Sequence, residues 1–298
     1  KGDTLVGFRE KRNSLIADLA QCEVLIPEVG HRFRDLRALI NGLDCRRRLP
    51  QIEVARGDDA VALVFRHLDP LSPADQDALV AFCREHGLQC YLQPGNESTV
   101  HRVWPEEGEE RLYYRHPQAD VEMAFHPSDF TQVNAEINRR MVPLALDLLE
   151  VEAHHQVLDL FCGVGNFALA LARAGASVVG IEGSEEMVAR AQENARKNRL
   201  DAVHFLPADL SKPLEMSAAP QRYTAALLDP PRDGADQLVA DLAAMGVARI
   251  LYISCNPATL ARDAGILAGK GYTLVRAGIM DMFPQTAHVE AMALFRRQ

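Results

Sequence analysis

From residue 126 to residue 298 the sequence repeats one order of segments: an apolar run, a turn rich in glycine, and an amphipathic stretch. Continuous apolar runs that alternate with helical stretches are typical of parallel strands buried on both faces of a sheet. We therefore expect a doubly wound, mostly parallel α/β sheet that binds its ligands at the carboxyl ends of its strands. The pattern predicts strands at 156–160, 177–181, 203–206, 225–228, 249–254, 273–277 and 289–295, and helices at 166–174, 185–198, 235–245 and 257–268.

The first 123 residues have a different pattern, which predicts a smaller α+β domain. Short strands are expected at 52–54 and 61–66, and an amphipathic helix over 73–86 that ends at Gly87. Residues 93–120 are expected to form a hairpin and a linker. The predicted domains are therefore 1–123 and 124–298. Because the first residue is Lys and the opening residues resemble a strand entered halfway, we expect a fragment that lacks its N-terminal part.

The chain has 32 Lys or Arg and 41 Asp or Glu, a net charge of -9, which argues against nucleic-acid binding through bulk charge. Arg32, Arg34, Arg37 and the run Arg46–Arg48 form either a local basic face or a solvated helix surface. No apolar run reaches the ~18 residues that a membrane span needs. Six scattered cysteines without a C-x-x-C pair indicate a reducing, cytoplasmic compartment.

The turn after the first strand of the α/β region contains Gly163 and Gly165, where the backbone can closely approach a ligand. Glu182 follows the second strand and can accept hydrogen bonds from both hydroxyls of a ribose. The full G-x-G-x-x-G pattern is missing, and the polar residues Asp159 and Asn166 flank the turn. This favours S-adenosylmethionine over NAD as the cofactor, with a plain tight turn as the alternative.

Two aspartates follow later strands. Asp209 can accept a hydrogen bond from an adenine amino group, or it caps a helix. Asp229 precedes two prolines at the end of a strand, an arrangement common in enzymes that methylate bases, because rigid backbone holds the carboxylate toward the target ring. Arg232 follows these prolines, where methyltransferases acting on amino groups usually have an aromatic residue. Methylation of an exocyclic amine is therefore disfavoured.

Cys255 follows the next strand, at a position where active residues collect in this fold. Asn256 can cap the following helix and Pro257 can start it, so the positive end of that helix is expected to lower the thiol pKa. A buried, inert cysteine is the alternative. A thiolate suits methylation of a pyrimidine, because its addition to carbon 6 makes carbon 5 nucleophilic.

The resulting adduct needs a base that removes the proton from carbon 5. Alternation along the last predicted strand would place His288 and Glu290 on one face. Glu290 is the better candidate for the base and His288 is the second. An ordinary surface Glu at the end of a strand remains the alternative.

Five segments together resemble the RNA uracil-5-methyltransferase family, and within it the enzymes that act on 23S ribosomal RNA. The resemblance covers nearly all of residues 126–298 and is more diffuse before them. It implies a class I S-adenosylmethionine-dependent methyltransferase fold after residue 123, preceded by an RNA-binding, iron-sulfur region. The segments are DFTQVN (Asp129–Asn134), DLFCGVGNF (Asp159–Phe167), LLDPPR (Leu227–Arg232), SCNPATLARD (Ser254–Asp263) and DMFPQTAHVEAM (Asp281–Met292).

The resemblance implies specific roles for residues at the site. Cys255 would be the nucleophile and Glu290 the base, and the target uridine would be flipped out of its stack. Phe130 either stacks near this uridine or belongs to the core. The positions implied to line the pocket for cofactor and target base are Gln132, Phe161, Asn166, Glu182, Asp209 and Asp229.

Family members of this type also carry a [4Fe-4S] cluster held by four cysteines. The resemblance makes Cys22, in the pair Gln21-Cys22, the candidate for the fourth ligand. The C-x5-C-x2-C run that supplies the other three ligands does not occur in this chain, nor does the small barrel that precedes it. A cluster is therefore expected in the full-length protein and not in the chain as given.

Three other functions remain open. A transfer RNA uracil-5-methyltransferase shares the chemistry, although Gln21-Cys22 and the segment SCNPATLARD favour ribosomal RNA. A catalytically silent RNA-binding factor would keep the fold but would need none of Cys255, Glu290 and Asp229. A dehydrogenase is the third alternative. We expect 23S ribosomal RNA as the partner, with no DNA and no membrane.

Overall fold

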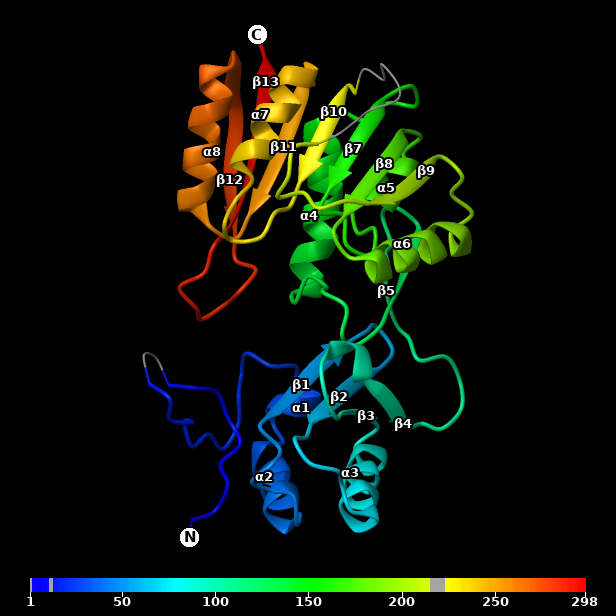
Figure 1. Cartoon of the computed structure of the whole chain (residues 1–298), viewed down its shortest axis with the longest axis vertical. Helices are drawn as coiled ribbons and strands as arrows, with labels where there is room; N and C mark the ends of the chain where they lie inside the picture. The colour runs from blue at the N-terminus through cyan, green and yellow to red at the C-terminus, as the bar shows by residue number, and fades with distance from the viewer. Residues whose placement is uncertain (1, 11–12, 215–222) are drawn as a thin grey trace. The chain divides into compact units, whose positions relative to one another are not determined.

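The computed structural model describes residues 2–10, 13–214 and 223–298 (Figure 1). The chain forms two compact units, and it passes between them through β5 (Leu112–His116) and β6 (Val121–Phe125), which pair as a two-stranded sheet. The functional division predicted at residue 123 stays a prediction. The first unit consists of Lys1–Tyr114 and Phe125–Ser128, and the second of Arg115–Ala124 and Asp129–Gln298.

The first unit is a four-stranded sheet with helices. Its strands β2 and β3 run parallel, and β1 and β4 run antiparallel to their neighbours. Apolar residues of the longer helices share one core with the central strands. The elements are α1 (Pro27–Gly30), α2 (Phe33–Gly42), β1 (Gln51–Arg56), β2 (Val61–Arg66), α3 (Pro73–Glu85), β3 (Gln89–Gln93), a 3-10 turn (Glu97–Thr99) and β4 (His101–Trp104).

Helix α3 confirms the helix predicted in this unit. The Ser72 hydroxyl accepts from the backbone N–H of Asp75, and Pro73 occupies the first turn. The helix ends before Gly87, whose φ of 67° suits a residue without a Cβ.

The second unit is a seven-stranded sheet in the order β12-β13-β11-β10-β7-β8-β9. Strand β13 runs antiparallel to both of its neighbours, and the pairs formed by β11, β10, β7, β8 and β9 are parallel. The expected doubly wound, mostly parallel sheet is confirmed. Its strands are β7 (Gln156–Leu160), β8 (Ser177–Glu182), β9 (Val203–Pro207), β10 (Ala225–Leu228), β11 (Arg249–Ser254), β12 (Tyr272–Met280) and β13 (Glu290–Arg297).

Helices cover both faces of this sheet (Figure 1). Apolar residues of α7 and α8 pack with side chains of β7, β10, β11 and β13 in one core. Helices α4 and α5 pack against each other, and α6 packs on β8 and β9. The helices are α4 (Ala135–Leu149), α5 (Ala168–Arg173), α6 (Glu185–Lys197), α7 (Asp236–Met245) and α8 (Pro257–Gly269). No helix in the described ranges is long and apolar enough to cross a membrane.

Two differences from the predicted bounds matter for the site. Helix α5 begins at Ala168 and not at Asn166, and Gly165, which has a φ of 97°, belongs to the turn before it. Strand β13 begins at Glu290, so His288 lies in the preceding loop. The alternation that was expected to place His288 and Glu290 on one strand face therefore does not apply.

Candidate active site

Four of the predicted site residues lie at one edge of the sheet in the second unit. Leu160, Leu228 and Tyr252 are at the same level of β7, β10 and β11, so the residues that follow them emerge together. Glu290 begins the antiparallel β13, and the pairing of Ser254 with Ala291 places it beside the end of β11. Neighbouring strands therefore bring Glu290, Cys255, Asp229 and Phe161 to a common edge.

The glycine turn and Glu182 form one hydrogen-bonded unit. Glu182 ends β8, and its Oε2 accepts from the Gly163 backbone N–H at 3.1 Å. Its Oε1 accepts from the Ser184 N–H at 3.1 Å, while the Ser184 hydroxyl caps α6. A carboxylate has about four acceptor positions, so Glu182 retains capacity for two ribose hydroxyls. Gly163 and Phe161 both have positive φ, at 54° and 62°.

Asp159, which we expected from the sequence to flank the glycine turn, is fully buried in β7. Neither of its carboxyl oxygens has a hydrogen-bond partner among the described residues. Burial raises its pKa well above the usual value, and the carboxylates of Asp229 and Glu182 raise it further. Its surroundings therefore favour the neutral form of Asp159 more than water does.

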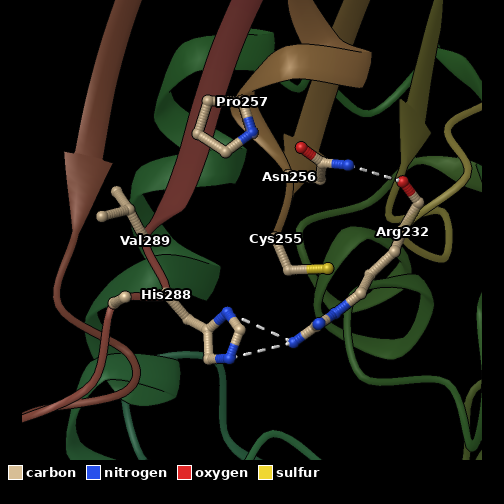
Figure 2. A pocket seen from close by; sticks show the side chains of 7 residues that line it. Arg232, Cys255, Asn256, Pro257, His288 and Val289 are labelled. Carbon is tan, nitrogen blue, oxygen red and sulfur yellow. Dashed lines mark hydrogen bonds between the residues drawn. The ribbon is translucent and has the colours of Figure 1, made fainter. Parts of the chain in front are cut away.

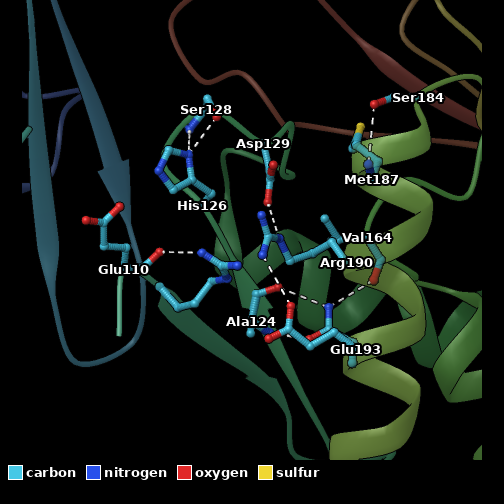
Figure 3. A network of polar contacts seen from close by, with 12 residues as sticks. Glu110, Ala124, His126, Ser128, Asp129, Val164, Ser184, Met187, Arg190 and Glu193 are labelled. Carbon is cyan, nitrogen blue, oxygen red and sulfur yellow. Dashed lines mark hydrogen bonds and ion pairs between the residues drawn. The ribbon is translucent and has the colours of Figure 1, made fainter. Parts of the chain in front are cut away.

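Gln132 and Asp229 are brought together. The Gln132 side-chain amide donates to Asp229 Oδ2 at 2.9 Å. The segment that carries Gln132 is anchored by Asp129, whose Oδ2 accepts from Arg190 Nε at 3.0 Å (Figure 3). Arg190 also reaches Glu193 on the same helix, at 3.3 Å.

Two other predicted residues have local partners instead. The Asn166 and Asn138 side-chain amides exchange two hydrogen bonds of 3.0 Å, and Asn166 Oδ1 lies 2.9 Å from His116 Nε2. Asp209 is exposed after β9, where Ser211 and Lys212 bind its carboxylate and lower its pKa. These contacts join Asn166 to α4 and β5, and Asp209 to the residues that follow it.

Cys255 lies between the end of β11 and the start of α8. The Asn256 side chain accepts from the Ala258 N–H, and Pro257 begins the helix, which confirms the predicted cap. The thiol opens into a pocket of about 320 Å³. Figure 2 shows the residues that line it, which are Arg232, Cys255, Asn256, Pro257, Ala287, His288 and Val289.

The expectation that the thiol pKa is lowered is wrong. Burial raises the pKa of Cys255, and the carboxylates of Glu290 and Asp229 raise it further, while Arg232 lowers it. The helix N-terminus that motivated the expectation is present, but burial, first, and then the two acidic neighbours raise the thiol pKa in spite of it.

Glu290 and Asp229 are both perturbed carboxyl groups. Glu290 is only 3% exposed, and burial together with the charge of Asp229 raises its pKa to about 7. Burial likewise raises the pKa of Asp229 to about 7, although the hydrogen bond from Gln132 opposes this. A carboxyl group that titrates near neutral pH can act as a general base in that range.

The remaining candidates lie outside this group. Phe130 is 69% exposed, so it is not a core residue. Cys22 is a free cysteine. Among the described residues, the side chains close enough to share a metal ion are Glu152, His154 and His155. The described residues therefore do not fit a [4Fe-4S] cluster at Cys22.

A seven-stranded sheet with one antiparallel strand, and with a glycine turn and an acidic residue at the carboxyl ends of its first two strands, defines a class I S-adenosylmethionine-dependent methyltransferase. A solved structure of the Pyrococcus abyssi tRNA (uracil-54, C5)-methyltransferase, in complex with S-adenosyl-L-homocysteine, matches with a TM-score of 0.75 and 25% identity. The match covers 98% of this chain and 72% of that one.

Comparison with sequence relatives identifies a family within this class. The family described as tRNA (Uracil-5-)-methyltransferase matches residues 111–298. The protein named 23S rRNA (uracil(1939)-C(5))-methyltransferase RlmD is 62% identical in Alcanivorax borkumensis and 50% identical in Hahella chejuensis. These matches cover 100% of this chain, and 67% and 68% of the two relatives. The chain belongs to the RNA uracil-5-methyltransferase family.

Proposed function

We propose that this protein methylates carbon 5 of a uridine in 23S ribosomal RNA, with S-adenosylmethionine as the methyl donor. The target would be the uridine equivalent to position 1939, which the names of its relatives give. The observation that carries the proposal is the grouping of Cys255, Glu290 and Asp229 on three neighbouring strands, beside a turn suited to a nucleoside. An enzyme acting on ribosomal RNA would work in the cytoplasm, as the cysteine usage predicts.

The residues present fit S-adenosylmethionine. Glu182 offers acceptors for the ribose, and the positive φ angles of Gly163 and Gly165 turn the backbone at the end of β7. Phe161 and Gln132 would line the same pocket, as would Asn166, which Asn138 and His116 hold in place. Asp209 would take the adenine amino group by exchanging its local hydrogen bonds. When bound, S-adenosylmethionine supplies an electrophilic methyl group for carbon 5.

The side chains at the edge divide the reaction between them. The Cys255 thiolate adds to carbon 6, and electron density moves from the carbon 5–carbon 6 double bond toward the carbonyl at carbon 4. Carbon 5 thereby becomes nucleophilic. After methylation, the Glu290 carboxylate removes the remaining proton from carbon 5, the double bond re-forms, and the thiolate leaves. Asp229, held by Gln132, would position the target ring.

The described residues do not supply three further ligands beside Cys22, so an iron-sulfur cluster in the full-length protein would need ligands from outside them. Transfer RNA is the second candidate substrate, since the solved relative named for transfer RNA aligns with 98% of this chain. The 62% identity to a ribosomal enzyme, against 25% to the transfer RNA enzyme, favours ribosomal RNA.

The deciding experiment incubates the protein with tritiated S-adenosylmethionine and unmodified 23S ribosomal RNA or transfer RNA, followed by nucleoside analysis. We expect label in 5-methyluridine from 23S RNA. Label confined to transfer RNA would select the second candidate, and unlabelled RNA despite normal cofactor binding would favour a silent RNA-binding factor. Cys255→Ala should abolish both the label and the covalent complex with 5-fluorouridine RNA, whereas Cys22→Ala should retain both.

A further inference from the structure

Arg232 shares the pocket of the Cys255 thiol. Of the residues that line this pocket in the described part of the chain, Arg232 alone has a permanent positive charge. Figure 2 shows the thiol of Cys255 pointing toward the side chain of Arg232. From the sequence, Arg232 only disfavours methylation of amines.

The charges that face the thiol come from three elements. Glu290 on β13 and Asp229 after β10 are acidic, and both disfavour the thiolate. Arg232, three residues after Asp229, favours it. His288, in the loop before β13, is the other titratable group in the pocket. Arg232 therefore supplies the charge that opposes the two carboxylates.

The loop that carries Arg232 is fastened to α8, the helix that begins beside the nucleophile. The backbone carbonyl of Arg232 accepts from Asn256 Nδ2 at 3.0 Å and from Thr259 Oγ1 at 3.3 Å. The next carbonyl, of Asp233, accepts from Arg262 Nη2 at 2.9 Å. The backbone of Arg232 is thus fixed relative to Cys255.

The side chain of Arg232 is held at its far end by His288. Arg232 Nη2 lies 3.3 Å from Nδ1 and 3.4 Å from Nε2 of the His288 ring. A guanidinium only donates hydrogen bonds, so a ring nitrogen must accept, which requires the neutral form of His288. In this position the His288 ring contacts the guanidinium of Arg232.

We propose that Arg232 is a further functional residue, which acts on the nucleophile. Its guanidinium stabilises the Cys255 thiolate and opposes the effect of the two carboxylates, and His288 positions that guanidinium. The role of this thiolate in methylation rests on the function proposed above. Ionisation of Cys255 itself needs neither RNA nor cofactor, so the two proposals can fail separately.

The test measures the rate at which iodoacetamide alkylates Cys255 as a function of pH, with the modified peptide followed by mass spectrometry. Only the thiolate reacts at an appreciable rate. Arg232→Gln should move the midpoint upward by about one pH unit and slow alkylation near neutral pH about tenfold. Arg232→Lys keeps a positive charge and should recover most of the native rate. His288→Ala, which frees the guanidinium, should shift the midpoint less than Arg232→Gln.

Arg196→Gln is the matched control, because it removes an exposed arginine on α6 and should leave the midpoint unchanged. Binding of S-adenosyl-L-homocysteine and the melting temperature establish that each variant is folded. A folded Arg232→Gln variant with the native midpoint would overturn the inference. A shifted midpoint in a protein that methylates no RNA would support the inference and count against the proposed function.

Discussion

The side-chain amide of Gln132 donates a 2.9 Å hydrogen bond to Asp229 Oδ2, although 97 residues separate them in the chain. Each belongs to a different segment of the family resemblance, DFTQVN and LLDPPR. The hydrogen bond favours the ionised form of Asp229 and partly offsets its burial. Two segments that look independent in the sequence therefore adjust the charge of one carboxyl group.

Glu290→Gln should stop the reaction after the methyl group has been transferred. Glutamine cannot accept the proton from carbon 5, so the covalent complex of protein and methylated RNA should accumulate. Gel electrophoresis under denaturing conditions, with labelled cofactor, detects this complex. His288→Gln is the control and should turn over, whereas stalling by His288→Gln and turnover by Glu290→Gln would assign the base to His288.

The release of methylated RNA should depend on pH through Glu290. Burial raises the pKa of this carboxyl from 4.5 to about 7, and only its ionised form can take the proton. The release rate in single turnovers should therefore rise with pH and reach half its maximum near pH 7. A rate that stays constant down to about pH 5.5 would show that Glu290 keeps an ordinary pKa or is not the base.

Glu182→Ala should weaken binding of S-adenosyl-L-homocysteine about tenfold or more, because hydrogen bonds from ribose hydroxyls to a carboxylate are lost. Isothermal titration calorimetry measures the change. Glu186→Ala is the control: it removes an exposed acidic side chain four residues after Glu182 and should bind S-adenosyl-L-homocysteine with the native affinity. Equal affinity of the two variants would exclude Glu182 as the ribose acceptor.

Asp229→Asn should stabilise the protein at alkaline pH. The pKa of Asp229 is about 7 in the folded state, whereas its ordinary value is 3.8. Between these two pH values the folded protein therefore keeps a proton on Asp229 that the unfolded chain has released. Stability from this group is therefore lost as the pH rises toward 7, and the uncharged variant avoids that loss.

The advantage of Asp229→Asn in the free energy of unfolding should grow by about 2–3 kcal/mol between about pH 5 and pH 8. Urea denaturation at the two pH values measures it. Asp201→Asn, at an exposed position, should follow the native protein. If Asp229→Asn and the native protein showed the same pH dependence of stability, burial would not raise the pKa of Asp229.

Asp263→Ala should destabilise the second unit by about 3 kcal/mol. The buried Asp263 carboxylate accepts from Tyr252 Oη at 2.7 Å, from the Ala235 N–H at 2.8 Å and from Arg262 Nε at 2.8 Å. Tyr252→Phe removes one of these bonds and should cost about 1 kcal/mol. Chemical denaturation compares both with Asp281→Ala, an exposed control, and a common midpoint for all three would contradict the prediction.

The sequence predicts the interior strands well and the ionisation of the site badly. Strands β7, β10 and β11 match their predicted bounds, because strands buried on both faces consist of continuous apolar residues. The raised pKa of Cys255 comes first from burial and then from Glu290 and Asp229, which approach it through strand pairing. A local rule based on the helix start could not include those charges.

Side chains in turns were also hard to place. The sequence marks Asn166 as polar and near the ligand, but its partners Asn138 and His116 lie on α4 and β5. The contact of Arg232 with His288 joins positions 56 residues apart. No periodic pattern encodes such pairs, because they follow from how two loops meet at the edge of the sheet.

Since β13 runs against its neighbours, Glu290 enters the site at the start of a strand, whereas Cys255 leaves one at its end. The pairing of Ser254 with Ala291 keeps these two residues beside each other at one edge of the sheet. The connection formed by residues 281–289 leads directly into Glu290 and carries His288, which contacts Arg232. A change in the length of this connection would therefore disturb the contact with Arg232 before it disturbed the strand pairing that holds Glu290 beside Cys255.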